Sequence, residues 1–381
     1  MWRRVLALPV LLGLLALAAC ASEEKATPAP ASPTAVGAKP EWQQEWDTVV
    51  EAAKKEGKVA VVAPTGAENR PGLTEPFERK YGIKVEYMAV AGAEHPPRIK
   101  AERDAGQYLW DIHIGGTTTI YTALKPMGVL DPMEPALILP EVKDPKNWRE
   151  GKLNFLDKDR LVLNFVTYAS EPFLVNPNLV KPEEFKSYRD LLDPRWKGKI
   201  VVRDPTVSGP GQARFVFYWW HKDLGPDFVR ALAGQDLVRS RDPRLELEWL
   251  AQGKYSICIG CALSQAPELD KPEIPIRPLD ARQMKEGGYL TTGWGNVFLY
   301  NKAPHPNAAK VYINWLLSRE GQTEALRAAG EYASRRLDVP LDRIKPLARP
   351  VDGWPILLDG EEGVLELRVK AQPFLRDVFG N

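Results

Sequence analysis

Short apolar runs that alternate with helical patterns constrain the fold of this chain more than any other feature. The runs are four to eight residues long and rich in Val and Ile, which is typical of buried strands. The strand patterns lie at residues 59–63, 83–90, 110–115, 197–204, 236–240 and 255–260. Between them lie segments whose apolar residues recur at helical spacing. Such an alternation of strands and helices predicts parallel, doubly wound α/β sheets.

Two long stretches interrupt the alternation. Residues 160–180 and 287–301 are apolar and extended, and they carry no helix signal. Between and around them, the helical patterns lie at residues 42–53, 73–81, 97–106, 116–128, 182–193, 210–221, 242–254 and 307–330. We therefore expect two α/β lobes joined by two extended crossovers. The predicted first lobe comprises residues 41–165 and 290–381, and the second lobe comprises residues 166–289.

The first forty residues predict export. Arg3 and Arg4 precede an uncharged apolar run, which is the layout of a secretory signal and is too short to span a bilayer. The run ends in Leu17-Ala18-Ala19-Cys20, which resembles the bacterial lipobox. This predicts a signal peptide over residues 1–19 and a lipidated Cys20 that anchors the protein to a membrane. The alternative is an ordinary secretory signal with a chance cysteine.

Residues 21–40 consist largely of Ala, Ser, Thr and Pro without apolar periodicity, as expected for a flexible linker after the anchor. The rest of the chain has the composition of a globular protein, since 44% of all 381 residues are hydrophobic. Its 51 basic residues balance 50 acidic ones, whereas a nucleic-acid-binding protein would need a basic face. The composition therefore predicts no nucleic-acid partner.

Several separated segments together resemble one known family. They include "WDTVVEAAKKEGKVAVVAPTG", "RIKAERDAGQYLWDIHIGG", "LLDPRWKGKIVV" and "APHPNAAKVYINWLLSREGQ". In order and spacing, over residues 41–340, they resemble the extracellular solute-binding proteins of ABC importers, in the branch of the ferric-ion-binding proteins. The resemblance implies a type II periplasmic-binding-protein fold, a hinge motion, delivery of a solute to a membrane permease, and no catalysis. We expect a monomer without cofactor or bound metal.

The expected ligand site lies in the loops that follow strands, because ligands of open α/β sheets bind outside the carboxyl ends of strands. Hydroxyls, glycines and helix starts in these loops favour an anion, and Arg214 would add a charged contact. The aromatic candidates stand on or near the crossovers. The candidate ligand-binding residues are Thr65, Gly66, Thr117, Thr118, Tyr168, Ser208, Gly209, Gln212, Arg214, Trp294 and Tyr332. Alternatively, Thr117 only caps its helix and Arg214 only faces solvent.

Two further functions remain open. The first is binding of ferric iron with a synergistic anion, although the chain lacks the adjacent tyrosines that the resemblance would imply for an iron site. The second is an exported redox enzyme that uses the Cys258–Cys261 pair, which has CxxC spacing but begins inside a strand pattern. We expect a buried, structural Cys258, with Cys261 either free or bridged to it. The four histidines are scattered and do not have zinc-site spacing.

Overall fold

A computed structural model describes residues 39–64, 69–90, 92, 94–263, 266–327, 330 and 332–380. The predicted signal peptide and Cys20 lie outside the described residues. Pro40–Asn381 forms one compact unit. Within the part of the chain that the structure describes, no helix combines the length and the apolar character needed to cross a bilayer.

The first sheet has six strands in the described chain, in the order β2-β1-β3-β13-β4 with β5 on β13. These are β1 Lys58–Ala63, β2 Lys84–Ala89, β3 Ile112–Gly115, β4 Leu130–Asp131, β5 Leu163–Asn164 and β13 Asn296–Tyr300. β1 pairs in parallel with β2 and β3, as the alternating pattern predicts. β13 runs antiparallel to β3, because it enters this sheet from the second crossover rather than from a helix.

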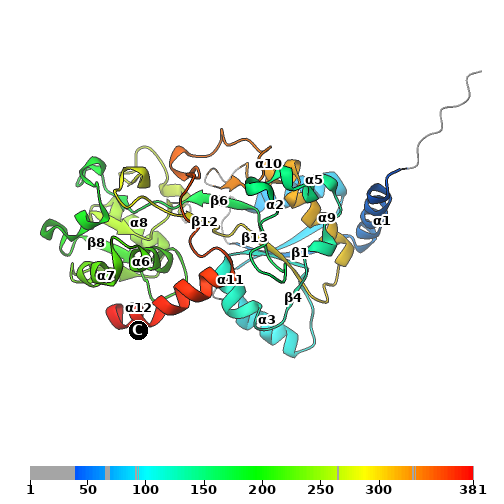
Figure 1. The fold of residues 1–381 in the computed structure, drawn as a ribbon, viewed down its shortest axis with the longest axis horizontal. Helices are drawn as coiled ribbons and strands as arrows, with labels where there is room; N and C mark the ends of the chain where they lie inside the picture. Colours follow the sequence, from blue (N-terminus) through cyan, green and yellow to red (C-terminus); the bar gives the residue numbers. More distant parts are fainter. Residues whose placement is uncertain are drawn as a thin grey trace, which may run out of the picture. The chain divides into compact units, whose positions relative to one another are not determined.

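Helices pack around this sheet (Figure 1). They are α1 Glu41–Glu56, α2 Asn69–Tyr81, α3 His95–Asp104, α4 Thr117–Thr119 with its π-helical continuation η1 Ile120–Leu124, α5 Pro140–Lys143, α9 Pro306–Leu317 and α10 Arg319–Ala325. The single helix expected over residues 307–330 is wrong in one respect: it is broken at Ser318. That residue is extended, with φ −71° and ψ 162°, and its side chain accepts a hydrogen bond from Gly321 N to start α10. Gly321 has no space for a side chain, since a Cβ there would lie 1.7 Å from the Trp315 carbonyl oxygen.

The second sheet has the order β11-β7-β10-β8-β9. Its strands are β7 Leu174–Val175, β8 Ile200–Arg203, β9 Val238–Ser240, β10 Ile257–Ile259 and β11 Arg277–Pro278, and its helices are α6 Pro210–Trp220, α7 Gly225–Ala233 and α8 Pro243–Ala251. β8 pairs in parallel with β9 and β10, and β7 pairs antiparallel with β10. The sequence pattern did not predict α7.

The helix predicted over residues 182–193 is replaced by the short 3-10 turns η5 Pro182–Glu184 and η6 Tyr188–Leu192. Ser187 starts the second turn, because its side chain accepts a hydrogen bond from Arg189 N while Asp190 accepts one from Ser187 N. Other 3-10 turns connect the larger elements: η2 Glu134–Ala136, η3 Pro145–Asn147, η4 Arg149–Gly151, η7 Pro194–Trp196, η9 Pro267–Leu269, η10 Ala281–Gln283 and η11 Pro346–Ala348.

Both predicted crossovers join the two sheets. β6 Val166–Ala169 lies between β5 of the first sheet and β7 of the second, and β12 Leu290–Thr291 lies between β11 and β13. The two pair antiparallel, and β14 Ala333–Ser334 pairs with the other edge of β6. The resulting three-stranded sheet, which we call the hinge sheet, confirms the two-lobe architecture with two extended connections.

The C-terminal segment makes a third connection between the lobes. It comprises α11 Gly360–Gly363, the π-helix η12 Val364–Val369 and α12 Lys370–Phe379, and it follows the first-sheet helix η1 before reaching α6 and α7 (Figure 1). Phe379 packs edge-to-face on Phe215 of α6, with ring centroids 5.0 Å apart. We predicted that residues 290–381 belong to the first lobe. Because the C-terminal segment contacts helices of both sheets, this assignment stays a prediction.

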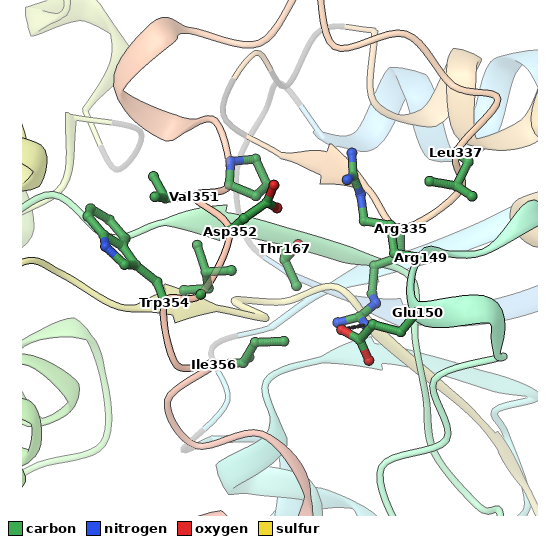
Figure 2. Close-up of a pocket in the computed structure, with 12 residues that line it drawn as sticks. Arg149, Glu150, Thr167, Arg335, Leu337, Val351, Asp352, Trp354 and Ile356 are labelled. Atoms are coloured by element: carbon green, nitrogen blue, oxygen red, sulfur yellow. Dashed lines mark hydrogen bonds and ion pairs between the residues drawn. The ribbon is translucent and has the colours of Figure 1, made fainter.

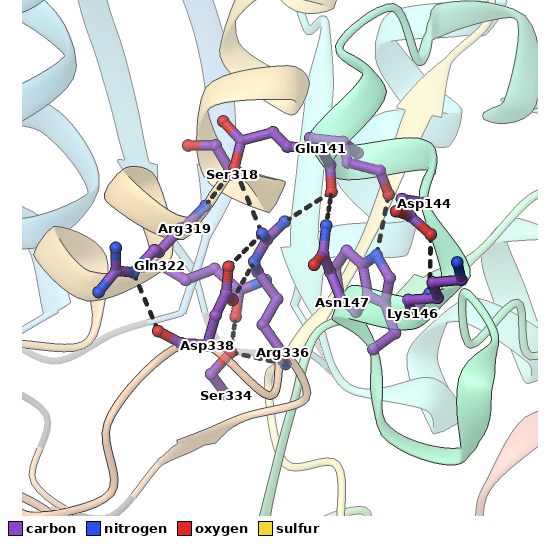
Figure 3. Close-up of polar contacts among 12 residues, drawn as sticks. Glu141, Asp144, Lys146, Asn147, Ser318, Arg319, Gln322, Ser334, Arg336 and Asp338 are labelled. Carbon is purple, nitrogen blue, oxygen red and sulfur yellow. Dashed lines mark hydrogen bonds and ion pairs between the residues drawn. The ribbon is translucent and has the colours of Figure 1, made fainter. Parts of the chain in front are cut away.

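Arg336 fixes β14 to the first lobe (Figure 3). Its side chain is fully buried and forms a two-point ion pair with Asp338, with both N–O distances 2.8 Å. The guanidinium also donates to the carbonyl oxygens of Glu141 and Leu317, each at 3.1 Å. Because these contacts join three separate parts of the chain, Arg336 holds the edge of the hinge sheet in place.

Candidate functional site

The first predicted ligand loop follows β3 and leads directly into α4. Gly116 is the extended N-cap residue of α4, and its neighbour Gly115 accepts a hydrogen bond from Asn296 Nδ2 at 2.8 Å. Asn296 in turn accepts a bond from Asn164 Nδ2 at 3.0 Å, and both asparagines are fully buried. This buried amide pair ties the start of the first crossover and the end of the second crossover to the carboxyl end of β3. A hinge therefore lies directly beside the predicted ligand loop.

Thr117 and Thr118 both point to the C-terminal segment. The Thr117 hydroxyl donates to the Leu358 carbonyl oxygen at 3.0 Å, and the Thr118 hydroxyl accepts a hydrogen bond from Arg368. Neither side chain caps α4. The alternative that Thr117 only caps its helix is therefore wrong, because its hydroxyl binds Leu358 instead.

The second predicted ligand loop follows β8 and leads into α6. Gly209 is its N-cap residue, with φ 150° and ψ −168°, a conformation that is essentially restricted to glycine. The first turn of α6 lies directly on the sheet, because a Cβ on Gly211 would meet the Arg203 carbonyl oxygen at 2.3 Å. Ser208 is exposed, and its side chain does not cap the helix.

Gln212 lies in the first turn of α6 and is buried. Its Nε2 donates to Gln372 Oε1, and Gln372 Nε2 donates to the Thr206 carbonyl oxygen at 2.7 Å. Gln212 Oε1 has no hydrogen-bond partner among the described residues. The C-terminal helix therefore contacts this loop as well as the loop that follows β3.

The structure does not place Arg214 in the role that we expected for it. Its side chain is buried, and the guanidinium donates to Ser170 Oγ at 2.9 Å, to Tyr188 Oη at 3.3 Å and to the Glu171 carbonyl oxygen. The Tyr289 ring centroid lies 4.7 Å away, and burial raises the pKa of Tyr188 to about 12. Because Arg214 is buried and three neutral groups take its hydrogen bonds, the alternative that it faces solvent is wrong, and its contact with a ligand stays a prediction.

The three aromatic candidates form one cluster. Tyr332 packs edge-to-face against Tyr168 of β6 and against Trp294, with centroid distances of 4.9 and 4.8 Å. Trp294 also contacts Phe165 of the first-lobe core, and its Nε1 has no hydrogen-bond partner among the described residues. A Cβ on Gly293 would meet the Tyr168 ring at 2.6 Å. The cluster therefore packs the hinge sheet beside the loop that follows β3.

Thr65 and Gly66 lie outside the described residues, so the structure does not test this part of the predicted site. The cysteine pair is described: Cys258 and Cys261 form a disulfide, and both are buried. Together with buried Glu246 they are the one group of His, Cys, Asp or Glu side chains in the described chain that is close enough to share a metal ion. Since the disulfide removes both thiolates, the residues do not fit a metal site.

A pocket with a volume of about 270 Å³ lies on the hinge sheet, and the sequence analysis missed it (Figure 2). Its lining residues are Arg149, Glu150, Thr167, Leu290, Arg335, Leu337, Pro350, Val351, Asp352, Gly353, Trp354 and Ile356. Thr167 and Leu290 share one face of the hinge sheet, whereas Tyr168 lies on the other because side chains alternate along a strand. Glu150 and Arg335 form an ion pair at 3.0 Å in this pocket. Arg149, Glu150 and Arg335 are recognisable in the sequence as charged residues. The sequence does not indicate that residues 149–150 and residue 335 lie close together in the fold.

Comparison with known proteins identifies the family. Residues 153–345, just over half of the chain, match the family of the bacterial extracellular solute-binding proteins. Among curated proteins, an uncharacterized protein of Haemophilus influenzae is 24% identical, covering 65% of this chain and 69% of that protein. Iron uptake protein A1 of Synechocystis is 22% identical, covering 44% of this chain and 48% of that protein.

Solved structures agree in fold. The periplasmic binding protein AfuA of Actinobacillus pleuropneumoniae, solved with exogenous fructose-6-phosphate, has a TM-score of 0.63 at 19% identity, covering 84% of this chain and 99% of that chain. A Trichodesmium protein (IdiA, FutA), in complex with iron and citrate, has a TM-score of 0.63 at 18% identity, covering 85% and 100%. The chain therefore has the two-lobe type II periplasmic-binding-protein fold and belongs to the bacterial extracellular solute-binding proteins, the solute receptors of ABC importers.

Proposed function

We propose that this receptor binds a small anionic solute between its lobes, at the first turns of α4 and α6, and delivers it to an ABC permease. One observation carries the proposal: residues from both first turns contact the same C-terminal helix. Thr118 contacts Arg368, and Gln212 contacts Gln372. Four residues of a helix span about 6 Å along its axis, so the two turns lie close enough for one solute to contact both.

The ligands of two structural neighbours support an anion. AfuA was solved with fructose-6-phosphate, and the Trichodesmium protein with iron and citrate, so each neighbour holds a solute or co-ligand with phosphate or carboxylate groups. In our proposal, hydroxyl, amide and backbone N–H donors at Thr118 and Gln212 bind such groups from both lobes. A solute held by both lobes favours the closed state, because the open state offers only half of the contacts.

A second candidate is ferric iron bound together with an anion. The contact between Tyr168 and Tyr332 favours it, because two neighbouring phenols could supply phenolate ligands to iron as the transported solute. We rank it second because both rings also pack in the hinge aromatic cluster. Titration with ferric citrate, compared with citrate alone, separates the two: a visible absorption band from iron-bound phenolate would support iron, and binding of citrate alone would support the anion.

We further propose that the chain is exported, lipid-anchored through Cys20, monomeric and without catalytic activity. The CxxC motif supports a structural role rather than a redox enzyme, since Cys258 is fully buried and Cys261 is nearly so. Thiol counting under native conditions, before and after mild reduction, tests this. A pair that stays oxidised is expected, whereas ready reduction would favour the redox enzyme.

Titration calorimetry tests the anionic solute directly. The panel comprises carboxylates, phosphonates, sulfonates, fructose-6-phosphate, ferric citrate and spermidine, and native mass spectrometry weighs any co-purified ligand. Thr118→Val should weaken binding of the best anion, whereas Thr122→Val should not, because Thr122 is an exposed threonine four residues further along the chain, in η1. Tight binding of spermidine with no binding of anions would contradict the proposal.

A further inference from the structure

Arg368 and Gln372 lie one helical turn apart, so they share one face of the C-terminal helix. Through this face the helix reaches two of the predicted ligand loops, those that follow β3 and β8. Arg368 donates to the Thr118 hydroxyl in the first lobe, and Gln372 contacts Gln212 and the Thr206 carbonyl in the second. Arg368 therefore lies where the contacts of the two lobes come together.

The guanidinium of Arg368 has no acidic partner in the part of the chain that the structure describes, although only 8% of the residue is exposed. Its hydrogen bond goes to a neutral hydroxyl, and desolvation alone lowers the pKa of Arg368 to about 10. Other buried arginines differ: Arg203 pairs with Glu246 at 2.7 Å and Arg336 with Asp338 at 2.8 Å. Arg214 also lacks an acidic partner, but it donates to three neutral acceptors, whereas Arg368 donates to one. A buried charge that lacks a counter-ion costs free energy, so this arginine calls for an anion.

Of the acids nearest to Arg368 in the sequence, Glu361 and Glu366 are paired with other cations, and Asp359 is half-buried but forms no ion pair with Arg368. Glu361 binds Lys125 at 2.5 Å, and Glu366 binds Lys370 at 3.1 Å. Further along the helix, Asp377 pairs with Arg230 at 3.3 Å. Glu362 is exposed to solvent. The acids of the C-terminal segment therefore do not neutralise Arg368.

A guanidinium carries five N–H donors, of which the Thr118 contact uses one. Carboxylate and phosphate groups match its planar fork and bind it in two-point geometry. The Thr118 hydroxyl, which accepts from Arg368, still has its own proton to donate. The buried amide of Gln212, from the second lobe, and the half-buried amide of Gln372 lie one turn away, and each Nε2 group donates one hydrogen bond in the structure and carries a second proton for an anion.

We propose that Arg368 is the cation of the solute site and binds an oxyanion group, carboxylate or phosphate, of the transported solute. This inference rests on the proposed function and gives it a specific residue: Arg368 takes the role that the sequence pattern assigned to Arg214. It lies in the C-terminal helix, outside every loop that follows a strand. The charge of the site therefore comes from the segment that connects both lobes.

Arg368→Gln tests the proposal, because glutamine removes the charge but keeps a donor for the Thr118 hydroxyl. Arg368→Lys keeps a charge without the fork, and Arg376→Gln is the matched control, since Arg376 is exposed in the same helix. Each variant is titrated by calorimetry and thermal shift with inorganic phosphate, citrate and fructose-6-phosphate. We expect Arg368→Gln to lose affinity roughly 10- to 100-fold for the best of these, Arg368→Lys to lose less, and Arg376→Gln to match the wild type.

The anion-free proteins provide a second readout. Because Arg368 is buried without a counter-ion, Arg368→Gln should unfold at the same temperature as the wild type or at a higher one when no anion is present, and it should gain little from added anion. Equal affinity in Arg368→Gln and wild type would overturn the role of Arg368 while leaving the anionic solute in place. If the wild type binds spermidine but none of the oxyanions, both the anionic solute and the Arg368 site are wrong.

Discussion

Two buried histidines should make this protein sensitive to mild acid. His95 and His113 are almost completely buried, their ring centroids lie 5.0 Å apart, and His95 Nε2 and His113 Nδ1 lie 2.5 and 3.2 Å from the Tyr300 hydroxyl. Burial lowers the pKa of His95 from 6.5 to about 4, and it lowers the pKa of His113 well below 6.5. The His95 side chain is therefore neutral in the folded protein at pH 5, and burial favours the neutral form of His113 as well.

The unfolded chain binds more protons than the folded one between pH 6.5 and pH 4, so stability falls as the pH is lowered through this window. For His95, the difference between the two pKa values gives a loss of about 2 kcal/mol at pH 5 relative to pH 7.5. His113 adds to this loss, because burial lowers its pKa in the same direction. The pair together therefore predicts a loss of more than about 2 kcal/mol.

Urea denaturation at pH 7.5 and pH 5.0 measures this loss. The double variant His95→Gln/His113→Gln has no titrating group at either position and should lose much less stability between the two pH values than the wild type. His221→Gln, which removes a histidine outside this cluster, is the control and should behave as the wild type does. An equal loss in the wild type and the double variant would refute the assignment of the acid sensitivity to these histidines.

Three further predictions concern the lipid anchor at Cys20, the proposed ligand loop after β8, and the Arg336 contacts that hold β14 to the first lobe. Cys20→Ala should move the protein out of the membrane fraction or block its processing, because buried acyl chains hold it at about 0.8 kcal/mol per methylene; unchanged fractionation would contradict the lipid anchor. Gly211→Ala should shift the first turn of α6 off the sheet, since its Cβ would lie 2.3 Å from the Arg203 carbonyl oxygen, so calorimetry should show weaker solute binding; full affinity would argue against this loop as part of the site. Arg336→Leu should destabilise the protein by about 3 kcal/mol in urea unfolding, because it leaves Asp338 and two carbonyl oxygens without their buried donor; a change below about 0.5 kcal/mol would contradict the clamp.

The sequence predicts the fold well where local signals decide the structure. Apolar runs and helical spacing locate β1, β3, β8 and α6 within a few residues, because burial and backbone preference act over short distances there. The prediction fails where tertiary contacts decide. Ser318 breaks a helix that its apolar pattern would continue, so that Gly321 can pack on the Trp315 carbonyl.

The candidate site shows the same division. The rule about strand ends predicts the two loops of the proposed site, but it does not predict Arg368 as the proposed cation. Arg214 looks available in the sequence, yet it is buried among aromatic side chains. Arg368 carries no sequence signal, since only the path of the C-terminal helix past both loops gives it a place in the site. Side chains that meet through long-range packing cannot be found from spacing along the chain.

Solution X-ray scattering with and without the tightest-binding anion tests the central claim most directly, namely that the two lobes close over a small anionic solute. The hinge sheet joins the lobes beside the loop that follows β3, so closure should reduce the radius of gyration in step with the occupancy measured by calorimetry. Wild type should contract at saturating anion, and Arg368→Gln should contract only at proportionally higher concentration. An unchanged radius of gyration at full occupancy would contradict closure, and contraction driven by a cation alone would contradict the anionic solute.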